Sequence, residues 1–235
     1  MTGQSPLTVT VALNKARPAK GQAAAAVRPE LQIQSSLQGL AIDLPAPLNK
    51  PAADAWPLKL THRSEGADGT NDRLTLELGS PQPWLIDYRR DTQGTSAKVR
   101  QGLWQIGSSS VGAPAADQVT AKVQLPQLDL DAWQKALDQR PSAPGPAEGA
   151  ASLGDLDDYL PDLLQFKAQD LVWKQRHFKD MAVTLTRPSA QTWRAQVEAP
   201  LMSGQIDVRQ EAQGRKVVAR LNRLSVPCLL YTSDA

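Results

Sequence analysis

Apolar and polar residues alternate along much of the chain, and the pattern is clearest between residues 181 and 210. In residues 181–187 apolar side chains stand at every second position, with alanine or threonine between them. Residues 192–199 and 201–210 repeat this spacing after short breaks that contain proline. Because successive side chains of a strand point to opposite faces, each run predicts a strand with one apolar and one polar face. The short breaks predict that successive strands pair in an antiparallel meander.

The first half of the chain shows the same two-residue period. It predicts strands at residues 7–13, 31–37, 56–61, 74–78, 84–88, 97–106 and 119–125. Pro45 and Pro47 must end the second of these strands, because proline cannot donate a ladder hydrogen bond. The pattern therefore predicts a mainly β fold of about ten to twelve strands, without a repeat of fixed period.

Two short helices are predicted between the strands. The first covers residues 128–139, where apolar residues recur at helical spacing and Asp129 or Asp131 can cap the start. The second covers residues 153–164 and is interrupted or ended near Pro161. So few helices leave a large apolar sheet face to cover. A second sheet or a sheet that curls over itself can do so, and a face left partly open binds something apolar.

Composition narrows the function classes. The 235 residues are 41% hydrophobic and 21% charged, which is typical of an ordered, soluble protein. The net charge of +2 and the lack of a basic run argue against nucleic-acid binding. No apolar stretch approaches the roughly 18–20 residues of a membrane span, and the first residues lack the layout of a signal peptide.

Residue types that carry chemistry are present, but their spacing does not predict a catalytic or metal site. His62 and His177 lie in different segments and form no ligand pair. The aspartates at 129–131 and 155–158 lack the glycine and glutamate of a calcium loop, and helix capping explains both clusters. Ser108–Ser110 has no base beside it. We therefore expect no enzyme, no metal and no cofactor.

Four segments carry a resemblance to a known family. They are residues 37–50 (Leu-Gln-Gly-Leu-Ala-Ile-Asp-Leu-Pro-Ala-Pro-Leu-Asn-Lys), 125–133 (Leu-Pro-Gln-Leu-Asp-Leu-Asp-Ala-Trp), 170–181 (Asp-Leu-Val-Trp-Lys-Gln-Arg-His-Phe-Lys-Asp-Met) and the strand pair from 201 to 227. Together they resemble the YhdP family, within the wider AsmA-like superfamily of bacterial envelope proteins. The resemblance covers about residues 7–227, and its motifs are specific as a set rather than singly.

This resemblance implies a long periplasmic protein that an inner-membrane anchor, absent from this stretch, holds in place. Its strands are expected to curl into an AsmA/TamB-like groove with an apolar lining. The resemblance further implies a role in moving phospholipid between the inner and outer membranes, with acyl chains and envelope proteins as partners. It supplies no catalytic residue. The alternative is a structural or assembly factor of the envelope that conducts no lipid.

Alternation selects the residues that we expect to line such a groove. Each buried methylene of an acyl chain gains about 0.8 kcal/mol, so a continuous aliphatic lining holds lipid without polar specificity. The candidates are Leu74, Leu76, Leu78, Val119, Val123, Met181, Val183, Leu185, Val197, Ile206 and Val208. The tryptophans at 84, 104, 173 and 193 stand at strand ends or turns, where they pack at a rim, line the groove mouth or form a sugar platform.

The composition also predicts how the chain is divided. Residues 140–152 are rich in proline, glycine and alanine, like a linker. We therefore expect a β-rich segment over residues 1–139 and a helix plus β-meander of the same groove over residues 153–227. Residues 228–235 match the translation of a transposase adapter used in sequencing libraries, the alternative being a natural apolar terminus. If these residues come from an adapter, Cys228 has no biological meaning. The absence of a membrane anchor from this stretch is then no evidence that the natural protein lacks an anchor.

Overall fold

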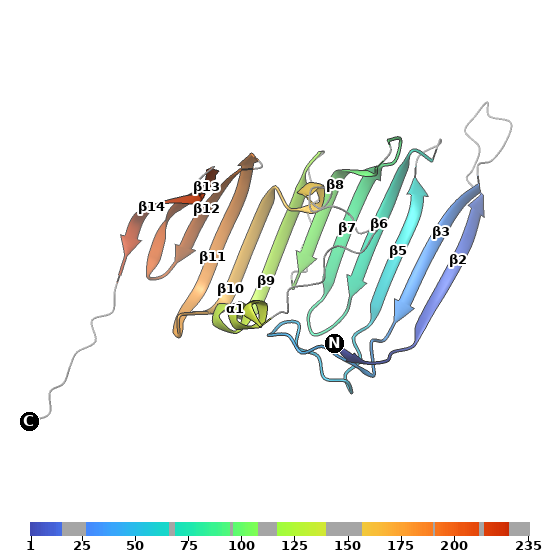
Figure 1. Cartoon of the computed structure of the whole chain (residues 1–235), viewed down its shortest axis with the longest axis horizontal. Helices are drawn as coiled ribbons and strands as arrows, with labels where there is room; N and C mark the ends of the chain where they lie inside the picture. The colour runs from blue at the N-terminus through green and yellow to red at the C-terminus, as the bar shows by residue number, and fades with distance from the viewer. Residues whose placement is uncertain are drawn as a thin grey trace, which may run out of the picture.

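Twelve β-strands form one continuous sheet in the computed structural model of the chain (Figure 1). The structure describes residues 1–15, 27–65, 69–94, 96–107, 117–139, 157–189, 191–211 and 214–225. The strands are β2 (Leu7–Lys15), β3 (Val27–Ser35), β5 (Leu58–Glu65), β6 (Asn71–Leu78), β7 (Trp84–Asp91), β8 (Lys98–Ile106), β9 (Val119–Asp129), β10 (Leu163–Trp173), β11 (Arg176–Ser189), β12 (Thr192–Ala199), β13 (Met202–Glu211) and β14 (Gly214–Leu224). Each strand pairs with its neighbours in chain order, and β2 and β14 form the two edges. The mainly β, meandering fold is confirmed.

Two strand pairs depart from the antiparallel expectation. β9 is parallel to β8, and β10 is parallel to β9. The chain must therefore return along the length of the strands after β8 and again after β9, whereas the other neighbouring pairs of the sheet are antiparallel. Sequence alternation predicts the strands but not their direction, since the same side-chain period fits both kinds of pairing.

The one regular helix among the described residues, α1 (Leu130–Asp138), lies close to its predicted place, and Asp129 caps its start by accepting a hydrogen bond from the Ala132 amide. The second predicted helix is wrong in part. Its described portion is a single 3-10 turn, η1 (Asp157–Tyr159), and β10 already begins at Leu163. The reason is pairing: residues 163–168 alternate and align with β9, a ladder that a helix ending at residue 164 would break.

Several sequence predictions lie outside the described residues. They are the linker at 140–152, the serines at 108–110, Asp155 and the tail at 228–235. The strands on either side of the predicted linker, β9 and β10, pair with each other, so one sheet contains residues from both predicted segments.

The two ends of the strands carry different structures (Figure 1). At one end lie α1 and the loop of residues 36–57, in which β4 (Leu40–Ala41) pairs with β1 (Thr2–Gly3). At the opposite end lies η1, which contacts β7 through Tyr88. We refer to these as the α1 end and the η1 end of the sheet.

Candidate functional site

The register of the sheet brings apolar residues from all twelve strands onto one face. Cross-strand partners share a face, so the register of the pairs assigns each residue to one side. One row runs from edge to edge without a polar residue, and we call it the central apolar row. It consists of Val9, Ile33, Leu60, Leu76, Ile86, Trp104, Ala121, Leu164, Leu185, Ala195, Ile206 and Ala219. At about 4.8 Å between strands, this row extends roughly 50 Å.

All eleven residues predicted from alternation lie on this apolar face. Leu76, Leu185 and Ile206 belong to the central row itself. Val119, Met181 and Val197 are buried, and the other eight are half-buried. The structure therefore brings the predicted set together on one surface, while its role as a lipid groove stays a prediction.

Other members of the apolar face were not predicted. Leu60, Ile86 and Leu164 occupy the central row beside predicted residues. Trp104, expected at a rim, also lies in this row, and its indole N–H donates to the hydroxyl of Tyr88. Alternation within each strand was enough to assign Leu60, Ile86 and Leu164 to the apolar face. The alignment between strands, which places Trp104 beside these residues, cannot be read from the sequence.

A charged cluster interrupts the apolar face at the η1 end. Arg90 donates two hydrogen bonds to Asp72, at 2.8 and 2.6 Å, and His62 Nε2 lies 2.8 Å from Asp72 Oδ2. Burial raises the pKa of the Asp72 carboxyl, but hydrogen bonds from Arg90 and His62 outweigh it and hold the pKa below its ordinary value of 3.8. The Asp72 carboxylate is therefore ionised at neutral pH, and its hydrogen bonds link β5, β6 and β7.

The η1 turn is attached to the same end of the face. The Arg90 guanidinium donates to the Tyr159 hydroxyl at 3.0 Å, and the Tyr88 hydroxyl donates to the Tyr159 carbonyl at 2.8 Å. Burial raises the pKa of Tyr88 to about 12, so its hydroxyl stays protonated and able to donate. On β11, Arg187 lies 2.8 Å from Asp157. These contacts fix η1 across the strands from β7 to β11.

At the α1 end, the helix and the loop of residues 36–57 are joined to each other. The Trp133 indole N–H donates to the Ala46 carbonyl at 2.9 Å. Within the loop, the buried ammonium of Lys50 donates to the carbonyls of Leu40 and Pro51. Asp131 accepts the backbone amides of Lys174 and Gln175, which ties α1 to the turn after β10.

A comparison with known protein families identifies the family to which this chain belongs. The family model described as YhdP protein matches residues 1–235. The chain belongs to the YhdP family. Membership indicates an AsmA-like protein of the bacterial envelope. Comparisons with curated proteins and with solved structures find no match.

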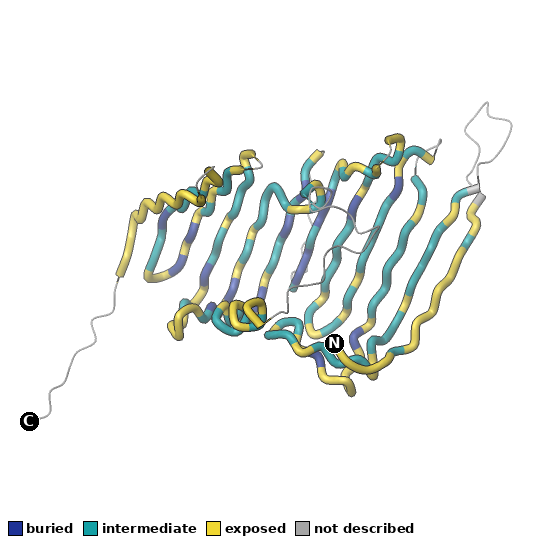
Figure 2. The backbone as a smooth tube through the Cα atoms, viewed as in Figure 1, coloured by how far each residue is buried: buried dark blue, intermediate teal, exposed yellow. Residues whose placement is uncertain are grey.

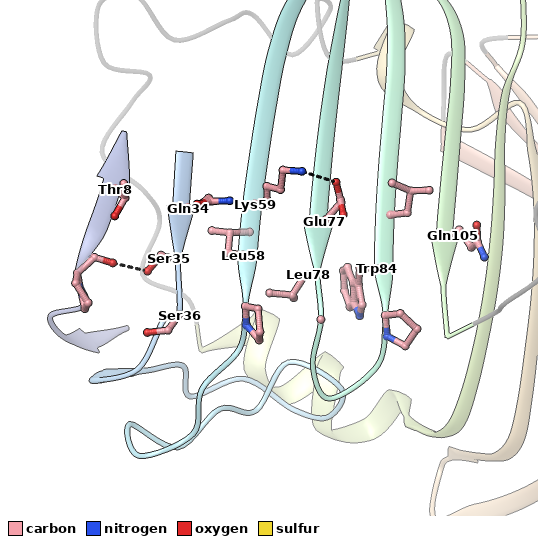
Figure 3. Close-up of a pocket in the computed structure, with 15 residues that line it drawn as sticks. Thr8, Gln34, Ser35, Ser36, Leu58, Lys59, Glu77, Leu78, Trp84 and Gln105 are labelled. Atoms are coloured by element: carbon pink, nitrogen blue, oxygen red, sulfur yellow. Dashed lines mark hydrogen bonds and ion pairs between the residues drawn. The ribbon is translucent and has the colours of Figure 1, made fainter. Parts of the chain in front are cut away.

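The opposite face of this YhdP-family sheet is polar. The row beside the central apolar row reads Thr8, Gln34, Lys59, Glu77, Leu85, Gln105, Lys122, Gln165, Thr184, Gln196, Gln205 and Arg220, and only Leu85 is apolar. Two cavities, of about 860 and 610 Å³, lie at the α1 end, take lining residues from both faces and share Pro83. Figure 3 shows the first, where Lys59 reaches toward Glu77. Each lining holds one cation and one anion.

Within the described part of the chain, nothing points to a metal centre. No group of three His, Cys, Asp or Glu side chains is placed to hold an ion there. His177 is exposed and lies 3.0 Å from Asp170, which also pairs with Lys179. Among the described residues, no helix has the length and apolarity to cross a membrane.

Proposed function

We propose that the apolar face holds the acyl chains of phospholipid. In this proposal the chain is one stretch of a periplasmic protein, anchored in the inner membrane, that conducts phospholipid between the inner and outer membranes. The observation that carries it is the central apolar row, because it crosses all twelve strands, and the second sheet among the described residues is only the two-stranded β1–β4 pair at the α1 end. Family membership supports the envelope setting.

The proposed role needs no bond-making step and therefore no catalytic residue. Each methylene buried on the face contributes about 0.8 kcal/mol, whichever aliphatic side chain it touches. Neighbouring positions along the row are nearly equivalent, so a bound chain can shift from one strand to the next without a large barrier. This property suits conduction better than tight storage.

The test is a charge placed in the central row, compared with the same charge on the polar face. Leu60→Asp alters the central row, whereas Thr61→Asp alters the next residue of β5, on the opposite side. Because an unpaired carboxylate in an apolar contact costs several kcal/mol, Leu60→Asp should lower bound phospholipid at least about tenfold. Thr61→Asp should stay within about twofold of wild type. The measurement is phospholipid extracted per mole of purified protein, with circular dichroism to confirm folding.

The buried cluster around Met181, Val197 and Ala199 favours a second candidate, a structural or assembly factor whose sheet packs without lipid. This candidate predicts that purified protein carries no phospholipid and that Leu60→Asp changes only stability. Lipid-free wild-type protein, or equal lipid content in the two variants, would refute the lipid proposal and leave the structural one.

A further inference from the structure

The apolar face is graded in polarity along the strands. Three rows, spaced two residues apart, can be followed on β5 to β7 from the α1 end. Leu58, Leu78 and Trp84 form the first row; Leu60, Leu76 and Ile86 form the second; His62, Leu74 and Tyr88 form the third. A fourth row consists of Ser64, Asp72 and Arg90 and is entirely polar. On these three strands, apolar character therefore ends at the fourth row.

We infer that this face binds amphipathic lipids in one orientation, with the polar head group at the η1 end over Ser64 and Asp72, and the tail tip at the α1 end. The inference rests on the proposed function and adds the direction of the bound molecule. A face that was apolar from end to end would give a lipid no preferred direction. A polar fourth row gives one, because the head group keeps more hydrogen bonds there than over the first row, whose one side-chain polar group is the buried Trp84 indole N–H.

The dimensions fit this orientation. From Leu58 in the first row to Ser64 in the fourth, the strand rises six residues, or roughly 20 Å. One leaflet of a bilayer is about 15 Å of hydrocarbon, half of the usual 30 Å core. An extended acyl chain therefore reaches across the first three rows and leaves its polar end at the fourth.

The structures at the two ends of the strands also favour a head group at the η1 end. The α1 end is occupied by the helix and by the loop of residues 36–57, which the Trp133–Ala46 hydrogen bond joins. At the η1 end, η1 contacts β7 and β11, while His62 on β5 keeps 38% of its side chain exposed. The exposed part of His62 is therefore open to a head group at the η1 end.

The chemistry of the fourth row favours head groups without a large net charge. Asp72 and Arg90 neutralise each other through two hydrogen bonds. What remains for a ligand is the Ser64 hydroxyl and the exposed side of the His62 imidazole, both hydrogen-bonding groups. A zwitterionic phospholipid head group matches this surface, and an apolar hydrocarbon gains nothing from it.

Site-specific fluorescence quenching tests the orientation. Leu58→Cys and Ser64→Cys place a bimane label at opposite ends of one strand on the apolar face, and Lys59→Cys places it on the polar face as a control. Cys228, the single cysteine of the chain, is replaced by serine in all three. Phosphatidylcholine carrying a nitroxide on its head group should quench the label at 64 at least about twofold more than at 58, given their roughly 20 Å separation. A nitroxide at the end of the acyl chain should reverse the order.

The outcomes separate the two proposals. If neither lipid quenches any label and the protein carries no phospholipid, the lipid-binding function falls and the orientation falls with it. If lipid is bound but both nitroxides quench positions 58 and 64 equally, or in the reverse order, only the orientation is overturned. Quenching at 59 equal to that at 58 would place the lipid on no particular face and overturn both.

Discussion

Strands β2 to β7 and strands β8 to β13 present the same apolar face with very different coverage (Figure 2). In the first half the leucines and isoleucines of the face are half-buried, and those of edge strand β2 are exposed. In the second half Ile106, Val119, Ala121, Leu125, Ala168, Met181, Val197 and Ala199 are buried.

This contrast separates two roles of one apolar surface. The β8–β13 half packs its own side chains together, as the cluster of Ala168, Met181 and Val197 with Phe166 and Val183 does. The β2–β7 half has fewer buried residues and leaves its apolar rows more open to a ligand, although Leu164, Leu185 and Ile206 of the central apolar row are also only half-buried. A change in the first half should therefore alter binding more than folding, and a change in the second should alter folding more than binding.

The largest expected effect comes from placing a charge in each half. Val197→Asp puts a carboxylate into the buried cluster, and we expect it to lower the free energy of unfolding by about 3–5 kcal/mol. Leu76→Asp, in the half-buried row of β6, should cost about 1 kcal/mol. Urea unfolding followed by circular dichroism measures both. Equal losses would mean that the two halves are covered alike.

A smaller loss of stability is expected when Gly102 is substituted. Gly102 lies on β8, where the two halves meet. A Cβ atom added there would lie 2.9 Å from the Tyr88 ring and 2.9 Å from Val119, and the Tyr88 ring is held in turn by Tyr159. Gly102→Ala should therefore lower the free energy of unfolding by about 1–3 kcal/mol. Gly94→Ala is the control, because its nearest contact would be 3.4 Å away in an exposed turn. A Gly102→Ala variant as stable as Gly94→Ala would show that the packing at this junction is loose.

The smallest effect concerns the charged cluster of the open half. The pKa of Asp72 is lower in the folded chain than its ordinary value of 3.8, so the carboxylate contributes stability above that value and loses it as pH falls below it. Asp72→Asn should be less stable than wild type at pH 7 by about 1 kcal/mol. The difference should shrink between about pH 4 and pH 2.

Melting temperatures across this pH range measure the effect. Arg90→Gln at pH 7 should reproduce most of the loss, because it removes the main partner of the same carboxylate. A stability gap between wild type and Asp72→Asn that stays constant down to pH 2 would mean that the Asp72 charge contributes nothing.

The sequence by itself determined which residues share a face. Strand side chains alternate with a fixed period of two, so Leu74, Val183 and Ile206 could be assigned to an apolar side without coordinates. The start of α1 was equally readable, because Asp129 precedes a run of apolar residues at helical spacing.

Only the tertiary structure decided how those faces align and what covers them. Alternation is the same for parallel and antiparallel pairs, so it could not predict the direction of β9 or the continuity of the central apolar row. The ion pair of Asp72 with Arg90 depends on a register between residues 18 positions apart, and the contact of Tyr88 with Tyr159 joins residues 71 apart. Local pattern fixes the side on which a residue lies, whereas pairing between distant strands fixes its neighbours, and binding depends on the neighbours.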